Sequence, residues 1–337
     1  MSLLILKEGI LTTIQDLGRF GHKRFGVNQT GVMDAGAARL INILLGNHQA
    51  EAVLEMHFPA DEILFERATI FALGGADFGA ELDGKPVDNW RSSFAKKGNV
   101  LKFRGKLAGN RAYLSVAGGL QIEKWLGSAS TNLTAAIGGY KGRQLQKGDR
   151  IGLNTKSTNK PTEVGTPNNS ATRSEFVSRR ISRSLVPPYS RFPVVRIIAG
   201  AEYGLLTASG QEALNQNFAI SNDSNRMGFR LIGPPLDLLE SKELLSSAVS
   251  FGTIQLLPDG QMIVLMADHQ TSGGYPRIAN VITRDLPLVA QLGPDDKLAF
   301  QLVSIEEAED LTMDFENELN LLRVGCSFSG YRQEILC

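Results

Sequence analysis

The segment 267–276, A-D-H-Q-T-S-G-G-Y-P, combines residue types that can bind a ligand and move a proton. It follows the apolar run 262–266, which is typical of a buried strand. Carboxylates and imidazoles transfer protons, amides bind polar substrates, and paired glycines expose backbone amides. Gly-Gly and Tyr-Pro also mark ordinary barrel-edge turns, but loops at strand ends often carry chemistry, so we favour a functional loop. The residues assigned to this site are Asp268, His269, Gln270, Thr271, Gly273, Gly274 and Tyr275.

A glycine-rich stretch near the N-terminus forms a second candidate. It contains Gln15, Asp16 and Arg19 and continues to residues 31–34, G-V-M-D. Such a loop can present amides to an anion, and an arginine can bind a carboxylate or phosphate at two points. Alternatively, Asp16 and Arg19 pair with each other and brace the loop. Both interpretations stay open, and the hydroxyl-rich segment 127–131 is typical of an ordinary turn.

A third candidate is the segment 224–236, S-N-R-M-G-F-R-L-I-G-P-P-L. On a strand, the even spacing of Arg226 and Arg230 would place both on one face, where they could bind one anion. A pair of surface arginines in a polar loop is the alternative. Gln255 is an amide in apolar surroundings, where it can bind a substrate amide or satisfy buried backbone groups. We expect the arginine-bearing segments and the loop 267–276 to form one wall of a common pocket.

Composition limits the class of protein. With 337 residues, the chain is long enough for two domains. Its 35 acidic and 35 basic residues balance, which argues against a broad nucleic-acid surface. The two cysteines form no disulfide framework and suit a reducing cytosol. No apolar stretch approaches a signal peptide or a membrane span, so we expect a cytoplasmic protein with no membrane partner.

Several familiar signatures are absent from the sequence. It has neither a P-loop nor a G-x-G-x-x-G motif after a strand, and it lacks a G-x-S-x-G elbow. The four histidines show no metal-ligand spacing, so we expect no metal site. No methionine-lysine-methionine tripeptide occurs, so the chain does not carry biotin itself.

Short strands bounded by glycine turns dominate the pattern. Apolar runs at 68–73, 112–117, 194–198 and 262–266 have strand length. Polar turns that lead into strands near residues 100, 151 and 298 occur in both halves, which hints at two similar barrels.

Few helices are expected. Asp34 can cap a helix that ends at Gly46. Ser209 with Glu212 and Ser304 with Glu307 each form a capping box. The second of these opens an amphipathic helix that should end before Gly325 and pack on the body of the protein.

The composition changes between residues 154 and 188, where Ser, Thr, Asn and Pro dominate. We therefore predict an N-terminal domain at 1–155, a polar linker or long loop at 156–189, and a C-terminal domain with its terminal helix at 190–325.

Taken together, these segments resemble the allophanate hydrolase subunit 2 family, also described as the biotin-dependent carboxyltransferase subdomain. Many bacterial members are described as the C subunit of 5-oxoprolinase. The segments that carry the resemblance are T-I-Q-D-L-G-R at 13–19, G-V-M-D at 31–34, V-A-G-G at 116–119, G-S-A-S-T at 127–131, 224–236, G-T-I-Q at 252–255 and 267–276. The order is kept from about residue 5 to 310.

The resemblance implies a mainly β chain with two cyclophilin-like β-barrel domains and a few short helices. It also implies a component of ATP-dependent 5-oxoprolinase, a hydrolase that converts 5-oxo-L-proline to L-glutamate and acts only with homologues of the A and B subunits. ATP, with Mg²⁺, would then be used by the complex. Arg19, Arg226 and Arg230 would surround a phosphoryl group, and Asp268 or His269 would manage the proton.

Two other functions stay open. One is carboxyl transfer to urea or a related amide, with biotin supplied in trans by a carrier. The other is a non-catalytic protein that binds and antagonises a kinase inhibitor.

Overall fold

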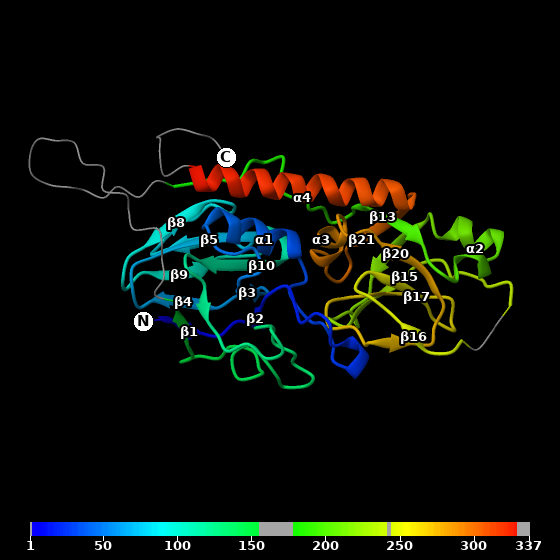
Figure 1. Cartoon of the computed structure of the whole chain (residues 1–337), viewed down its shortest axis with the longest axis horizontal. Coiled ribbons are helices and arrows are strands. Elements are labelled where there is room, and N and C mark those ends of the chain that lie inside the picture. Colours follow the sequence, from blue (N-terminus) through cyan, green and yellow to red (C-terminus); the bar gives the residue numbers. More distant parts are fainter. Residues whose placement is uncertain (1, 155–177, 241–243, 329–337) are drawn as a thin grey trace, which may run out of the picture.

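A computed structural model of the chain describes residues 2–154, 178–240 and 244–328 (Figure 1). Its first half contains two antiparallel sheets. The seven-stranded sheet has the order β11 (Leu120–Gln121), β12 (Arg150–Leu153), β1 (Ser2–Lys7), β4 (Glu62–Phe65), β9 (Val100–Phe103), β6 (Ala80–Leu82) and β7 (Lys85–Pro86). The five-stranded sheet has the order β2 (Thr12–Gln15), β3 (Val53–Met56), β10 (Ala108–Val116), β5 (Thr69–Asp77) and β8 (Ser92–Ala95).

The two sheets enclose one apolar core, because their strands alternate inward and outward side chains. Phe65 on β4 and Phe71 on β5 lie in this core with ring centroids 5.0 Å apart. Ala72, the next residue on β5, points to the opposite face, where helix α1 (Ala35–Leu44) covers the sheet.

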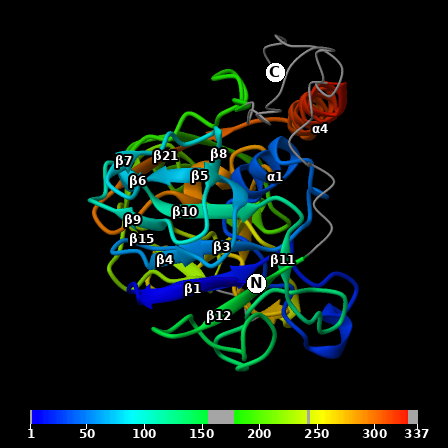
Figure 2. The ribbon, with the colours of Figure 1, turned by 90° about the vertical axis from the view of Figure 1, so that its left-hand side faces the viewer.

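Helix α4 (Ile305–Phe328) follows the second half of the chain in sequence but packs along α1 of the first half (Figure 2). Its Phe315 and Leu319 are buried against that helix, and Arg39 of α1 forms a 2.6 Å ion pair with Glu316. The predicted packing of this helix on the body of the protein is confirmed, and its apolar stripe covers the first half.

The second half is a closed barrel. Its strands run in the order β13 (Val194–Ala199), β20 (Arg277–Val281), β17 (Thr253–Leu256), β18 (Met262–Leu265), β15 (Gly228–Ile232), β14 (Asn217–Ile220) and β21 (Lys297–Leu302). A small ribbon pairs β16 (Ser247–Ala248) with β19 (Ser272–Gly273) beside the barrel. The short helices are η1 (Lys23–Phe25), η2 (Tyr203–Leu205), α2 (Ala208–Ala213) and α3 (Leu286–Ala290).

The predicted mainly β fold is confirmed, and each apolar run predicted as a strand lies in one. The Asp34 cap is also confirmed, since its carboxylate accepts a 2.8 Å hydrogen bond from the Ala37 amide. Two helix predictions are wrong. Thr207, rather than Ser209, caps α2 by accepting from the Gly210 amide. Helix α4 continues through Gly325 to Phe328, because Leu322 and Cys326 on its last turns are buried against the first half.

Residues 155–177, which include most of the predicted linker at 156–189, lie outside the described residues. The remainder, from residue 178, packs on the first half: Arg180 forms a β-bridge with Arg91, and Ile181 is buried. Among the described residues, no helix has both the length and the apolarity to cross a bilayer.

Candidate functional site

Four of the residues predicted from the sequence line one hollow on the outer face of the closed barrel. They are Arg230, Gln255, Gln270 and Tyr275. The alternation of β18 sends Met262 and Val264 into the barrel core and Ile263 and Leu265 outward. The outward face then forms the floor of a hollow of about 260 Å³. We call this the barrel hollow. It is lined by Asp223, Asn225, Met227, Gly228, Arg230, Gln255, Leu257, Ile263, Leu265, Gln270 and Tyr275.

Strand register places the polar groups of the barrel hollow. Ile263 is the cross-strand partner of Arg230 on β15 and of Gln255 on β17, so these three side chains form one row. The loop 267–276 closes over the row. Gln270 donates a 3.2 Å hydrogen bond to the Gln255 side-chain oxygen, and Gln255 donates to the Tyr275 carbonyl at 3.4 Å. Three amides, one guanidinium and the Asp223 carboxylate surround this apolar floor, and such a set suits a small polar molecule that carries an amide.

The two adjacent glycines serve close packing in this loop. A Cβ on Gly273 would lie 2.6 Å from the Gln255 side-chain nitrogen, so the glutamine approaches the backbone where the sequence suggested a ligand. Gly274 has more room, with its nearest neighbour, the Leu244 carbonyl oxygen, 3.4 Å from such a Cβ. Thr271 lies at the barrel surface and accepts a 3.4 Å bond from the Val249 amide through its carbonyl.

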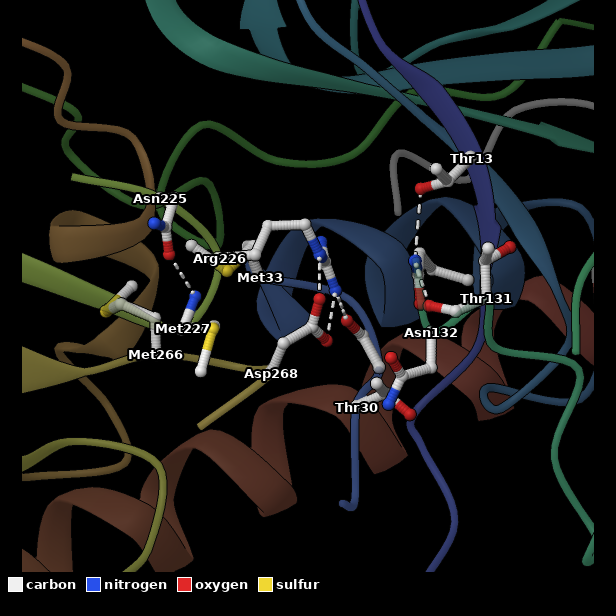
Figure 3. A network of polar contacts seen from close by, with 12 residues as sticks. Thr13, Thr30, Met33, Thr131, Asn132, Asn225, Arg226, Met227, Met266 and Asp268 are labelled. Carbon is white, nitrogen blue, oxygen red and sulfur yellow. Dashed lines mark hydrogen bonds and ion pairs between the residues drawn. The ribbon is translucent and has the colours of Figure 1, made fainter. Parts of the chain in front are cut away.

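Arg226 does not share a face with Arg230, so that prediction is wrong. Arg226 precedes β15 in an irregular turn, where strand alternation does not apply, and its side chain is buried between the two halves. It donates to Asp268 at 2.8 Å and to Glu55 of β3, and it also donates to the Gly31 carbonyl at 2.6 Å. Figure 3 shows Arg226 and Asp268 facing one another.

In this network two buried carboxylates share one buried guanidinium. Burial lowers the pKa of Arg226, but the carboxylates of Glu55 and Asp268 raise it well above its ordinary value. Glu55 also accepts from the Met33 amide at 2.8 Å and from the Tyr113 hydroxyl at 2.9 Å. The arrangement joins the halves, and neither Asp268 nor His269 is among the residues that line the barrel hollow.

His269 is held as a neutral imidazole. Its Nδ1 lies 2.8 Å from the Met266 carbonyl, which can only accept, so Nδ1 carries the proton and Nε2 is an acceptor. Lys23 donates to that Nε2 at 3.2 Å. Burial lowers the pKa of His269, and the Lys23 charge lowers it further. Asn28 also reaches across from the first half and donates to the carbonyls of Asp268 and His269.

Asp16 and Arg19 do not pair with each other. The Asp16 carboxylate accepts hydrogen bonds from the Ser128 and Ser130 hydroxyls, both at 2.6 Å, and from the Ala129 amide at 2.7 Å. Arg19 donates instead to the Thr30 hydroxyl and the Ser130 carbonyl. Both residues therefore fasten the segment 127–131.

Gln15 belongs to the same buried cluster as Asp16 and Arg19. It donates to the Thr131 carbonyl at 3.1 Å and to the Thr13 hydroxyl at 3.0 Å. The labelled Thr13 and Thr131 lie on the first-half side of the view in Figure 3.

The expected common pocket is in fact two separate hollows. Arg19 lines a second hollow of about 350 Å³ in the first half, which we call the loop hollow. Its other lining residues are Phe20, Gly21, Lys23, Arg24 and Gln29, and it shares no lining residue with the barrel hollow. The loop 267–276 touches both neighbourhoods, because His269 contacts Lys23 while Gln270 and Tyr275 line the barrel hollow.

Two residues that are important in the structure, Glu55 and Lys23, were not predicted from the sequence. Glu55 is a fully buried charge inside the apolar strand β3, and a lone acid in such a run was the signal available. Lys23 belongs to no recognisable pattern, and its contact with His269 spans 246 positions of sequence.

Comparison with known proteins agrees with this architecture. A curated relative from Haemophilus influenzae, named as the C subunit of 5-oxoprolinase, is 37% identical over 92% of this chain and 94% of its own length. Its namesake from Escherichia coli is 35% identical over 91% of this chain and 93% of its own length. The crystal structure of the K. lactis urea amidolyase superposes with a TM-score of 0.86 and 27% identity, covering 95% of this chain and 20% of that one. Residues 25–302 match the family described as carboxyltransferase domain, subdomain A and B, and this chain therefore belongs to that family.

Proposed function

We propose that this chain is the C subunit of an ATP-dependent 5-oxoprolinase, which opens the lactam of 5-oxo-L-proline to L-glutamate together with homologues of the A and B subunits. The observation that carries the proposal is the 37% identity to a protein of that name, which extends over nearly the whole length of both chains.

The barrel hollow has groups that match each part of this substrate. Arg230 is exposed at the rim and forms no ion pair with a described carboxylate, so its guanidinium is free to bind the substrate carboxylate. The amides of Gln255 and Gln270 can bond to the lactam carbonyl and N–H. Ile263 and Leu265 offer an apolar floor to the ring methylenes.

The chemistry requires activation, because a lactam carbonyl is a poor electrophile. Transfer of a phosphoryl group from ATP to the lactam oxygen would make the ring carbonyl carbon attackable by water. The ring C–N bond would then break, and a second water would hydrolyse the resulting acyl phosphate to glutamate and phosphate. This chain would bind and orient the ring. The catalytic roles predicted for Asp268 and His269 stay predictions; within this proposal both residues position the loop that carries Gln270, since Asp268 bonds to Arg226 and His269 to Lys23.

Reconstitution tests the proposal. The purified A and B subunits and this chain are mixed with ATP, Mg²⁺ and 5-oxo-L-proline, and glutamate is measured. We expect glutamate only when this chain is present. No glutamate from partners that are active with a known C subunit would reject the assignment.

In the same assay, Arg230→Gln should raise the KM for 5-oxo-L-proline by roughly 10- to 100-fold, the effect of losing one charge-assisted hydrogen bond. Arg323→Gln, at an exposed site on α4, is the matched control and should leave KM unchanged. An unchanged KM in Arg230→Gln would place the lactam elsewhere.

Carboxyl transfer to urea is the second candidate, and the TM-score of 0.86 to the urea amidolyase favours it. Incubating the chain with a carboxylated biotin carrier and urea separates the two functions. Urea-dependent loss of the carboxyl group from the carrier would support the transferase and contradict the lactam hydrolase.

A further inference from the structure

Every charged residue that lines the loop hollow is a cation. Arg19, Lys23 and Arg24 line it together with Phe20, Gly21 and Gln29, and none of these residues is an acid. Among the described residues, none of the three cations forms an ion pair with a carboxylate. The charge gathered here is therefore not neutralised by direct contact within the part of the chain that the structure describes.

Arg19 is the most constrained of the three cations. Only 1% of it is exposed, and both oxygens to which it donates are uncharged. Its Nε–H is buried and has no partner among the described residues. Burial lowers the pKa of Arg19 by more than the nearby charges of Asp16 and Asp268 raise it. The guanidinium also lies over the Trp125 ring, 5.1 Å from its centroid, so all its direct contacts are with uncharged groups. A buried guanidinium without a carboxylate partner favours the binding of an anion.

Lys23 extends this positive surface toward the second half. Its ammonium donates to the Val249 carbonyl at 3.3 Å and to His269 Nε2 at 3.2 Å, and both acceptors are neutral. An ammonium has three donors, so one is left for a ligand. Arg24 is exposed, and its guanidinium lies over the Phe25 ring, 4.7 Å from the ring centroid.

We propose that the loop hollow is a binding site for a phosphate-type oxyanion, with Arg19 at its floor and Lys23 and Arg24 at its sides. Three cations with no carboxylate in direct contact match an anion that carries two or more charges better than a singly charged carboxylate. The volume of about 350 Å³ admits a group larger than a single phosphate. This proposal is independent of the proposed reaction, because every residue of the loop hollow belongs to this chain and none of them lines the barrel hollow.

Binding to the full chain tests this site directly. Isothermal titration at low ionic strength would use inorganic phosphate, pyrophosphate and ATP, with acetate as the singly charged comparison and adenosine as the uncharged one. We expect phosphate and pyrophosphate to bind, with pyrophosphate tighter, while acetate and adenosine bind at least about tenfold more weakly. ATP that binds no tighter than pyrophosphate would identify a phosphate site, whereas a further gain would assign the base to the same hollow.

Single substitutions of residues that line the loop hollow test whether phosphate binds there. Lys23→Gln and Arg24→Gln should each weaken phosphate by roughly tenfold or more, since each removes a charge-assisted hydrogen bond. Lys97→Gln, in the turn between β8 and β9, is the matched control and should not change affinity. Thermal unfolding of each variant shows whether it is folded.

Three results would overturn the proposal: no phosphate binding by the folded wild type, affinities unaffected by both hollow variants, or acetate binding as tightly as phosphate. Because glutamate production is not the readout, failure here would leave the proposed lactam hydrolysis untouched, and the reverse also holds.

Discussion

Arg226 and Arg19 are both buried arginines, yet their surroundings are opposite. Arg226 is 7% exposed and donates to two carboxylates, Glu55 and Asp268. Arg19 is 1% exposed and donates to a hydroxyl and a backbone carbonyl. The pKa of Arg226 is raised by its partners, whereas the pKa of Arg19 is lowered by burial.

The difference in partners distinguishes Arg226, a charge with a structural role, from Arg19, a charge that can bind a ligand. A buried ion pair with both partners in place joins two segments, and removing one partner leaves the other charge unpaired. A buried cation whose partners are neutral is still short of an anion. We infer that Arg226 holds the two halves together and that Arg19 serves the loop hollow.

The largest effect should come from Arg226→Ala. Removing this side chain leaves Glu55 and Asp268 buried without a cation, so the free energy of unfolding should fall by about 3–5 kcal/mol. Urea denaturation followed by circular dichroism measures it. Arg323→Ala, on the exposed face of α4, is the comparison and should change stability by no more than about 0.5 kcal/mol. A loss below about 1 kcal/mol in Arg226→Ala would show that the network does not bind the halves.

Asp61 is a buried acid that, among the described residues, forms no ion pair, so it can be compared with the two arginines. Burial raises its pKa from 3.8 to about 6, the Gly9 amide opposes that rise, and the Glu8 and Asp149 charges add to it. A folded-state pKa above the unfolded one stabilises the fold below pH 3.8, and this contribution is lost as the pH rises through about 6. About two pKa units correspond to at most about 3 kcal/mol.

Asp61→Asn should remove this pH dependence while keeping an oxygen for the Gly9 amide. Its stability relative to wild type should therefore increase between about pH 4 and pH 7, as measured by urea denaturation at several pH values. Parallel stability curves for the two proteins would contradict the raised pKa.

The smallest effect should come from Arg19→Met. The substitution takes one hydrogen bond each from Thr30 and Ser130 but leaves no carboxylate that Arg19 had contacted, so we expect a loss of about 1–2 kcal/mol. Measured beside Arg226→Ala, it sharpens the contrast between the two arginines. If the two losses were equal, the distinction between a compensated and an uncompensated charge would fail.

Local sequence patterns predicted most strands and helices, because interactions between neighbouring residues decide where such elements form. The apolar run 262–266 became β18, and Asp34 capped α1, since strand alternation and capping need only neighbouring residues. Local rules misjudged the cap of α2, where a threonine two positions earlier competed with Ser209. They also ended α4 too soon, because burial against α1 outweighs the cost of one helical glycine.

In the candidate site, too, some residues were predicted correctly from local sequence, whereas the place of others depends on long-range packing. Arg230, Gln255, Gln270 and Tyr275 were predicted from their types, and they do meet in one hollow. Arg226 was assigned to that neighbourhood, but its side chain turned toward Glu55, which lies 171 positions away in sequence.

By itself, the sequence determined a mainly β chain, most of its strands and caps, and the polar loop at 267–276. Only the tertiary structure decided which charges are compensated and that two hollows exist instead of one pocket. The physical reason is that hydrogen bonding within an element depends on adjacent residues, whereas the state of a buried charge depends on whatever long-range packing brings within a few ångströms of it.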